Sequence, residues 1–187
     1  MSEDGFKKAS VLFPNFYECL QLALVVVYAT GSFLDLGTGP ATQAIWLAKR
    51  GLKVIGSDLS EAAIKRARNV YASEIDVDFR VDDILNSKLK GNEFDYVFDR
   101  GCFHVLSPAN RQICISKMNG VLKDKGILFL KCFSDKEPRQ EGPYKFSQQE
   151  IRDLFSKYFR IDSIKETVYQ GTLDPLPKAL FAVMIKK

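Results

Sequence analysis

Short runs of apolar residues alternate along the chain with longer segments in which apolar positions recur every three or four residues. The short runs have the length and composition of buried strands, and the longer segments have the period of amphipathic helices. The predicted strands cover residues 32–36, 53–57, 77–81, 94–98, 127–133, 160–169 and 179–186. The predicted helices cover residues 15–29, 41–50, 60–71 and 107–122 and a segment that begins at Ser147. Strands that alternate with helices are typical of parallel βαβ units.

Capping residues mark several helix ends. Ser147 and Glu150 have the spacing of a capping box, and Ser107 precedes a proline at the first helical position. Gly51 stands where a helix commonly ends in a left-handed residue. These signals support the helix boundaries that the apolar periodicity predicts.

The order of elements predicts an α/β fold. We expect a Rossmann-like, doubly wound, mostly parallel seven-stranded sheet with an antiparallel last strand and helices on both faces. The last strand is predicted to be antiparallel because residues 171–177 leave no room for a crossover helix before it. A length of 187 residues suits a single domain. In that domain residues 1–30 would be a helical cover and residues 31–187 the Rossmann-like core.

Acidic residues follow four successive predicted strands, at the edge where open α/β sheets bind ligands. Strand one continues as Asp35-Leu36-Gly37-Thr38-Gly39-Pro40-Ala41-Thr42, and the next three strands end in Asp58, in Asp82-Asp83-Ile84 and in Asp99-Arg100-Gly101-Cys102-Phe103-His104. Gly37 and Gly39 lack the Cβ atoms that would keep a ligand from the backbone, and the next helix starts with free N–H groups. Asp58, nineteen residues after Gly39, can accept both hydroxyls of a ribose. The pattern predicts a nucleoside-containing cofactor.

The same residues discriminate between cofactors. A dinucleotide-binding motif needs a small residue where this chain has Thr42, which disfavours a nicotinamide-dependent oxidoreductase. Asp35 and Asp99 would repel a pyrophosphate, whereas they would attract the sulfonium and ammonium of S-adenosylmethionine. S-adenosylmethionine is therefore the predicted cofactor.

At this point the sequence resembles a family. The stretch FLDLGTGPATQAIWLAKRGLKVIGSDLS resembles the cofactor-binding half of class I S-adenosylmethionine-dependent methyltransferases. The later stretches DRGCFHVL, ILFLKCFSD and EGPYKFSQQEI resemble the branch that contains thiopurine methyltransferase and the tellurite-resistance methyltransferases. The resemblance runs from about Ser32 to the C-terminus. It departs from the family at Pro40 and Ala41, where many members have a third glycine.

The resemblance implies a role for each matching position. Backbone around the two glycines would hold the methionine part, Asp58 the ribose hydroxyls, and Leu59 would lie beneath the adenine. Asp83 would accept from the adenine amino group, and Ile84 would offer its backbone and a stacking face. Asp99 would lie near the cofactor ammonium. The implied cofactor-binding residues are Asp35, Gly37, Thr38, Gly39, Asp58, Leu59, Asp83, Ile84, Asp99 and Arg100.

His104 and Tyr144 are the candidate catalytic residues. His104 is the only histidine, and Tyr144 ends a polar, flexible segment, residues 134–144, that is long enough for a functional loop. We expect a small acceptor, such as a thiol, a thiopurine-like compound or another soft or aromatic nucleophile, between residues 100–104 and this loop. His104 can equally be a structural residue bonded to backbone, because no carboxylate neighbours it in the sequence.

Phe103 and Arg139 are expected to line the same acceptor pocket, as an apolar surface and a polar anchor. Asp99 and Arg100 also fit a structural ion pair, and Cys102 and Cys132 fit inert packing better than a reactive thiol.

Composition and charge narrow the class of partner. The formal net charge is only +4 and the basic residues form no continuous tract, so we expect no nucleic-acid partner. The motif Asn/Asp-Pro-Pro-aromatic, used by enzymes that methylate base amino groups, is replaced by Asp99-Arg100-Gly101-Cys102. A catalytically inactive module that only binds the cofactor is the non-enzyme alternative.

Cysteine spacing and hydropathy complete the expectations. The four cysteines form no C-x-x-C pair, which argues against a structural metal site. The longest apolar run, residues 22–29, is too short for a bilayer span, and MSEDGFKKAS has no apolar signal-peptide region. We expect a cytoplasmic protein with no membrane partner, acting as a monomer or weak homodimer.

Overall fold

The computed structural model describes residues 31–71 and 76–187, and the predicted helix at residues 15–29, with the helical cover it would belong to, lies outside them. The strands are β1 (Ser32–Leu36), β2 (Lys53–Asp58), β3 (Val77–Val81), β4 (Phe94–Asp99), β5 (Leu122–Ser134), β6 (Lys145–Phe146), β7 (Phe159–Val168) and β8 (Lys178–Lys186). The α-helices are α3 (Thr42–Ala48), α4 (Glu61–Tyr71), α5 (Pro108–Val121) and α6 (Gln148–Phe155). Two 3₁₀ turns, η2 (Ile84–Asn86) and η3 (Phe103–Val105), follow β3 and β4.

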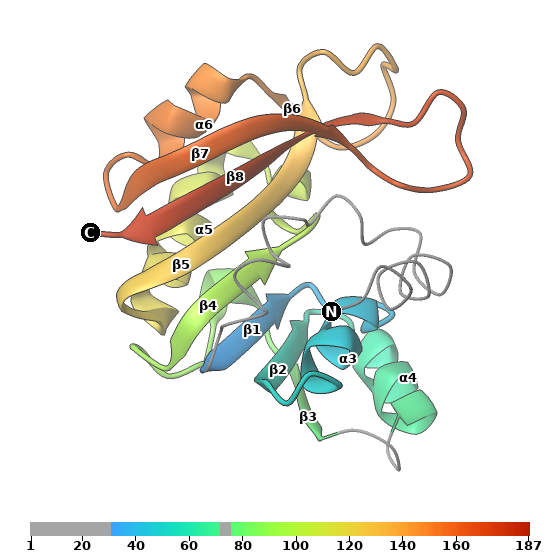
Figure 1. Cartoon of the computed structure of the whole chain (residues 1–187), viewed down its shortest axis with the longest axis vertical. Helices are drawn as coiled ribbons and strands as arrows, with labels where there is room; N and C mark the ends of the chain where they lie inside the picture. The colour runs from blue at the N-terminus through green and yellow to red at the C-terminus, as the bar shows by residue number, and fades with distance from the viewer. Residues whose placement is uncertain (1–30, 72–75) are drawn as a thin grey trace, which may run out of the picture.

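The strands form one twisted sheet in the order β3-β2-β1-β4-β5-β8-β7, and β6 pairs with β5 beside this path (Figure 1). Strands β1 to β5 are parallel, while β8 is antiparallel to both β5 and β7. The predicted fold class, including the antiparallel last strand, is confirmed. Because β1 lies between β2 and β4, the direction of winding reverses there. Open α/β sheets bind ligands in a crevice at the carboxyl ends of the strands at such a reversal, and here the ends of β1, β2 and β4 flank it.

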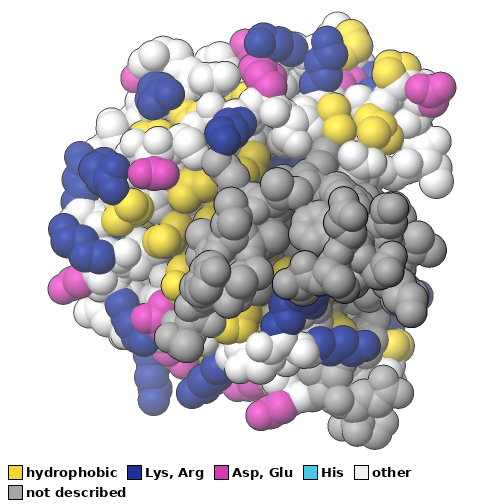
Figure 2. Space-filling model, viewed as in Figure 1, with side chains coloured by type: hydrophobic (Ala, Val, Ile, Leu, Met, Phe, Trp, Pro, Cys, Tyr) yellow, Lys and Arg dark blue, Asp and Glu magenta, His cyan; other side chains and the backbone are white. Residues whose placement is uncertain are grey.

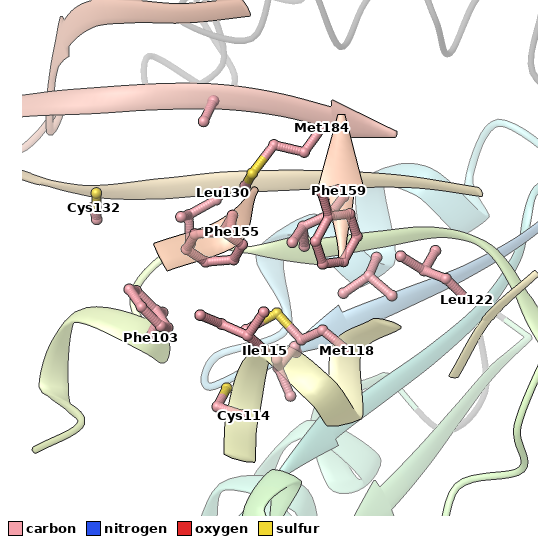
Figure 3. Close-up of a cluster of buried hydrophobic side chains, with 14 of the residues drawn as sticks. Phe103, Cys114, Ile115, Met118, Leu122, Leu130, Cys132, Phe155, Phe159 and Met184 are labelled. Carbon is pink, nitrogen blue, oxygen red and sulfur yellow. The ribbon is translucent and has the colours of Figure 1, made fainter. Parts of the chain in front are cut away.

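Helices cover both faces of the sheet, as predicted. One face packs on α5 and α6 through large side chains such as Phe103, Phe155 and Met118 (Figure 3). The other face packs on α3 and α4 through residues that include Trp46 and Phe129. Successive residues of a strand point to opposite faces, so a strand buried on both sides must be apolar at nearly every position. This is why β1 and the second half of β5 are mostly apolar in the sequence, whereas the edge strand β3 (VDFRV) alternates apolar and charged residues.

The helix ends follow local sequence signals. Ser147 accepts from the backbone N–H of Glu150 and the Glu150 carboxylate accepts from the Ser147 N–H, so the predicted capping box is confirmed. Gly51 has φ +80°, a left-handed conformation that glycine adopts at little cost. The side chain of Ser60 accepts from the N–H of Ala63 at the start of α4.

Strand β5 begins at Leu122 directly after α5, but its continuous pairing with β4 and β8 begins at Ile127, the predicted first residue of the strand. Its pairing with β4 ends at Asp99 and Leu130, so the last four residues of β5 extend beyond β4. On the other side β8 stays paired with β5 as far as Phe133. The carboxyl end of β5 therefore overhangs the crevice and forms one side of it.

Candidate functional site

The loop after β1 is held against the end of β2. The backbone N–H of Thr38 donates to the carbonyl of Ser57 at 2.9 Å, and the N–H of Gly39 donates to Oδ2 of Asp58 at 2.9 Å. The other oxygen of Asp58 accepts from the N–H of Ser60 at 2.8 Å. The structure thus brings Gly37, Thr38, Gly39 and Asp58 together.

Backbone conformation explains the glycines. Gly37 has φ +68° and Gly39 has φ +49°, values that other residues adopt only with strain. A Cβ on Gly37 would lie 3.2 Å from the Cβ of Cys102, whereas a Cβ on Gly39 would find only the Gly37 carbonyl, at 3.9 Å. The space where a Cβ of Gly39 would stand is therefore open, and a ligand can approach the backbone there. Ala41 is also left-handed, with φ 59°, so the position of the family's third glycine keeps a glycine-like conformation here.

Asp35 lies beneath this loop. Its side chain is nearly inaccessible, and Oδ2 accepts from the hydroxyl of Thr38 at 2.6 Å. Burial raises the pKa of Asp35 to about 6, although the bond from Thr38 and the charge of Arg100 oppose the shift. A carboxylate that is costly to ionise gains from a cationic ligand, since the cation restores the favourable interaction that water would provide.

The end of β3 contributes a second acidic turn. Oδ1 of Asp83 accepts from the N–H of Leu85 and caps η2. Oδ1 of the preceding Asp82 accepts from the N–H of Lys88, and its Oδ2 is buried with no hydrogen-bond partner among the described residues. Ile84 is in the apolar core, so its side chain offers no open stacking face and only its backbone remains for a ligand.

Asp99 is fully buried and bonded to its own turn. Oδ1 accepts from the N–H groups of Gly101 and Cys102, and Oδ2 accepts from that of Phe103, all at 2.8–2.9 Å. Burial raises the pKa of Asp99 to about 6 despite these three bonds. Among the described residues no ion pair joins Asp99 to Arg100. The hydrogen bonds of Asp99 hold the turn after β4 in place.

His104 is held by the overhanging end of β5. Its Nδ1 accepts from the backbone N–H of Phe133 at 3.3 Å, and its ring stacks on that of Phe133 at 5.1 Å between centroids. The residue is 6% exposed, and burial lowers the pKa of His104 to about 4. The ring is therefore neutral at pH 7, with Nδ1 as an acceptor and the proton on Nε2. A Cβ on Gly101 would lie 3.2 Å from Nε2, so that glycine leaves space beside the donor.

Tyr144 is half-exposed and lies at the far side of the same turn. Its backbone N–H donates to the carbonyl of His104 at 2.9 Å, and the guanidinium of Arg111 lies 4.6 Å from the centre of its ring. His104 and Tyr144 are thus neighbours through their backbones.

The prediction that Phe103 lines the pocket is wrong. Its side chain is 0% exposed and packs on Phe146 and Phe155 under α5 and α6 (Figure 3). In the tight turn after β4, Phe103 and His104 point in different directions, and only His104 stays at the crevice. Arg139 does not reach this turn in the structure. It bonds instead to Glu137 and to the carbonyl of Pro175.

Sequence reasoning missed an aromatic cluster next to His104. Phe133 and Tyr169 lie 4.8 Å apart between ring centroids, and Tyr169 lies 5.9 Å from His104. The hydroxyl of Tyr169 donates to the carbonyl of Lys131 at 2.9 Å, and the carbonyl of Arg100, at 3.4 Å, is a second and weaker acceptor of the same proton. A signal was available, because β7 is parallel to β5 and Tyr169 follows its carboxyl end. Residues that follow the carboxyl ends of parallel strands are candidates for ligand contact, and this criterion also selects Tyr169.

The two half-buried or buried thiols near the crevice fit the inert interpretation. Burial raises the pKa of Cys102 and of Cys132 well above the usual range, so both stay protonated at neutral pH.

Other features of the described residues lie away from this edge. A cavity of about 570 Å³ opens at the amino ends of the strands, where Ser32, Lys53 and Asp95 line it, and is separate from the acidic edge. On the face seen in Figure 2, Lys and Arg side chains are dispersed among acidic ones. Within residues 31–71 and 76–187, no helix is long and apolar enough to cross a membrane. The same residues contain no group of three or more His, Cys, Asp or Glu that could hold a metal ion.

The residues present suit S-adenosylmethionine. Gly39 leaves the backbone open to a ligand, and Asp58 keeps lone pairs for hydroxyl donors. Leu59 beside it is 71% exposed, which leaves an apolar surface for a base. Asp35 supplies negative charge beneath the loop, where a cation would be favoured. Hydroxyl acceptors, an apolar surface and a carboxylate together match a ribose, an adenine and a sulfonium with its ammonium.

Comparisons with known proteins agree with this geometry. Residues 33–126 match the model of a family described as a methyltransferase domain. A 2-heptyl-1-hydroxyquinolin-4(1H)-one methyltransferase of Mycobacteroides abscessus is 31% identical over 142 residues, which are 72% of this chain and 61% of that protein. The chain thus spans less than two thirds of this curated relative's length.

Two solved structures share the fold. One is the Burkholderia thailandensis 1,6-didemethyltoxoflavin-N1-methyltransferase with bound 1,6-didemethyltoxoflavin and S-adenosylhomocysteine. It has a TM-score of 0.74 and 15% identity, over 98% of this chain and 84% of that chain. The other is TehB from Haemophilus influenzae, with a TM-score of 0.72 and 18% identity, over 94% of this chain and 66% of that chain.

Proposed function

Because the chain belongs to the S-adenosylmethionine-dependent methyltransferases, the family whose domain residues 33–126 match, we propose that it methylates a small-molecule acceptor. The observation that carries the proposal is the joined edge of β1 and β2. There the Asp58 carboxylate holds the glycine loop by the Gly39 N–H and presents its remaining lone pairs beside an exposed Leu59.

The placement of the cofactor residues supports a role for each. Asp58 binds the ribose hydroxyls, Leu59 lies against the adenine, and the backbone of residues 37–39 lines the methionine part. Asp35 supplies the negative charge that attracts the sulfonium and ammonium. Asp83 and the backbone of Ile84 face the adenine edge, whereas Asp99 acts indirectly, by fixing the turn that carries Arg100 and His104.

When bound, S-adenosylmethionine supplies an electrophilic methyl group on an already activated leaving group. The protein then has to align the acceptor and exclude water. His104 suits alignment better than proton removal, because Nδ1 is occupied by the Phe133 N–H and the lowered pKa opposes protonation. Its Nε2–H can donate to an acceptor atom that is already negative.

We therefore propose an acceptor that is acidic enough to arrive ionised, such as a thiolate or an acidic aromatic hydroxyl or N-hydroxyl. The Mycobacteroides relative, named for a hydroxyquinolinone, and the toxoflavin-precursor complex both concern small heteroaromatic compounds. The rings of Phe133, Tyr169 and His104 give this chain a surface on which such a planar ring can pack. Tyr144 completes the site on its open side.

The finer family assignment is also a proposal. We place the chain in the branch that contains thiopurine methyltransferase and the tellurite-resistance methyltransferases. The support is the likeness of fold to TehB together with the stretches that begin at Asp99, Ile127 and Glu141.

Binding and transfer should be measured separately. Calorimetric titration is expected to show binding of S-adenosylmethionine and S-adenosylhomocysteine, and none of NAD. Labelled S-adenosylmethionine should then give methylated product with thiophenol, 6-mercaptopurine or 2-heptyl-1-hydroxyquinolin-4(1H)-one. Binding without transfer to any of the three would favour an inactive cofactor-binding module, and binding of NAD alone would refute the proposal.

A further inference from the structure

Glu137 is a buried carboxylate in the middle of the polar segment between β5 and β6. Its side chain is 2% exposed, although Lys136 and Pro138 on either side are exposed. Three N–H groups converge on it. Oε1 accepts from the backbone N–H and from Nη1 of Arg139, at 3.2 and 2.6 Å, and Oε2 accepts from the backbone N–H of Lys178 at 2.6 Å. A buried charge with this many donors is stabilised rather than strained.

Burial by itself raises the pKa of Glu137, but the N–H groups of Lys178 and Arg139 lower it by more. The net pKa lies below the ordinary glutamate value, so the side chain is ionised at neutral pH. The ionised form is the one that can accept all three bonds.

These bonds join two segments that are far apart in the sequence. Lys178 is the first residue of β8, and Nη2 of Arg139 donates to the carbonyl of Pro175. Pro175 lies in the connection between β7 and β8 and Lys178 at its end, and this connection projects from the same end of the sheet as residues 134–144 (Figure 1). The exposed ion pair of Lys136 with Glu166, at 2.8 Å, adds a weaker tie nearby.

Both joined segments also reach the turn after β4. At the end of residues 134–144, the N–H of Tyr144 donates to the carbonyl of His104. At the start of the β7–β8 connection, the hydroxyl of Tyr169 shares its proton between the carbonyl of Lys131 in β5 and, more weakly at 3.4 Å, the carbonyl of Arg100. Residues 100–104, 134–144 and 169–178 therefore form a closed series of hydrogen bonds around the proposed acceptor site. We call these three segments the acceptor rim.

We propose that Glu137 is a positioning residue that holds the two long segments of the acceptor rim as one wall and so sets which acceptors fit. The inference rests on the proposed function, because it takes the rim to face the acceptor. It adds that shape selection depends on a carboxylate that touches neither cofactor nor acceptor. A segment that is rich in Gly, Pro and charged residues is thereby kept in one conformation.

The test is Glu137→Gln, which keeps the size of the side chain but places an amide NH₂ opposite an N–H donor. At least one of the three bonds must then be lost. The matched control is Glu141→Gln, which removes the same charge from an exposed position in the same segment. Hydrogen exchange of the intact protein should rise at least tenfold in residues 134–144 and 169–178 together for Glu137→Gln, and in neither for the control.

The kinetic readout separates positioning from general stability. For the probe acceptor that the parent methylates, KM should rise about tenfold or more in Glu137→Gln, while the dissociation constant of S-adenosylhomocysteine stays within twofold. Arg139→Gln, which keeps the Lys178 bond and loses the Pro175 bond, should shift both readouts in the same direction and serves if Glu137→Gln does not fold.

Unchanged exchange in both segments would overturn the inference, as would an equal loss of S-adenosylhomocysteine affinity or an equal effect of Glu141→Gln. Absence of transfer by the parent to every probe would instead count against the proposed function. In that case exchange still decides whether Glu137 joins the two segments.

Discussion

Oδ2 of Asp58, the last residue of β2, accepts a hydrogen bond from the backbone N–H of Gly39 in the loop after β1, at 2.9 Å. The side chain that would bind the ribose thus also shapes the loop that would hold the methionine part. The order of the strands predicts that Gly39 and Asp58 lie near each other. It does not predict that Asp58 both faces the ribose and holds the loop.

We expect Asp58→Ala to weaken binding of S-adenosylhomocysteine by about 2–4 kcal/mol, because two charge-assisted hydrogen bonds to the ribose are lost. The loss of the bonds from Gly39 and Ser60 should also lower the free energy of unfolding by about 1–3 kcal/mol. Calorimetric titration and urea denaturation measure the two effects. Glu61→Gln, at an exposed position three residues further on, is the control. Parent-like affinity in Asp58→Ala would show that the ribose contact is misplaced.

Cofactor affinity should fall as Asp35 becomes protonated. Its pKa is raised to about 6, so the carboxylate is charged at pH 7.5 and mostly neutral at pH 5. The charge that we propose attracts the ammonium is lost over this range, and the affinity for S-adenosylhomocysteine should fall about tenfold. Titrations across the range measure it. In Asp35→Asn the affinity should be low at both pH values and nearly independent of pH, and a variant that kept the parent's profile would count against Asp35.

The free energy of unfolding should also depend on pH, through His104. Its pKa is about 4 in the folded chain and near 6.5 when unfolded, so between these values the unfolded state binds more protons. The contribution of His104 is therefore full above pH 6.5 and is lost as pH falls towards 4, by about 3 kcal/mol. Asp35 and Asp99, with pKa raised to about 6, contribute in the opposite sense over the same window.

His104→Asn isolates that contribution, because the amide oxygen can still accept from the N–H of Phe133 but does not titrate. Urea denaturation at pH 7.5, 5.5 and 4.5 should show the variant gaining stability relative to the parent as the pH falls. Parallel pH profiles for the two proteins would mean that His104 is not buried as a neutral ring.

Gly56, in the middle of β2, has no room for a side chain. A Cβ there would lie 2.8 Å from the ring of Phe79 and 3.0 Å from the hydroxyl of Thr38. Gly56→Ala should cost about 1–3 kcal/mol of stability and weaken cofactor binding by displacing Thr38 from Asp35. Gly120→Ala is the matched control, because nothing lies within 4 Å of its Cβ position near the end of α5. That variant should be neutral or stabilised by up to about 1 kcal/mol. Equal melting temperatures for both variants would contradict the packing argument.

Much of the fold could be predicted because its signals are local. The central strand β1 is mostly apolar on both faces, and the capping box of Ser147 with Glu150 depends on four consecutive residues. The start of β5 could not be predicted in this way. Lys123, Asp124 and Lys125 look like a loop in the sequence, and they do interrupt the pairing, because the register with β4 jumps from Leu122 to Ile127 and Lys125 has φ 63°. The isolated pairing of Leu122 with Phe94 ahead of this stretch has no local signal.

The candidate site also has parts that the sequence predicts and parts that it does not. The placement of Asp35, Gly39 and Asp58 at adjacent strand ends follows from the order of strands. The side chains of Phe103 and Ile84 lie in 3₁₀ turns, and the sequence does not predict which residue of such a turn faces the core and which faces the crevice. The bonds of Glu137 join segments 41 residues apart and leave no periodic signal in the sequence.

The position of β8 has a consequence for biosynthesis. This strand is the latest in the chain, yet it lies between β5 and β7 and pairs with both. While the chain emerges from the ribosome, β7 has no neighbour until residues 178–186 are free, and the outer edge of β5 stays open. The C-terminal half of the sheet must therefore close after synthesis of these residues rather than strand by strand, and a nascent chain stalled before Lys178 would expose two unpaired edges.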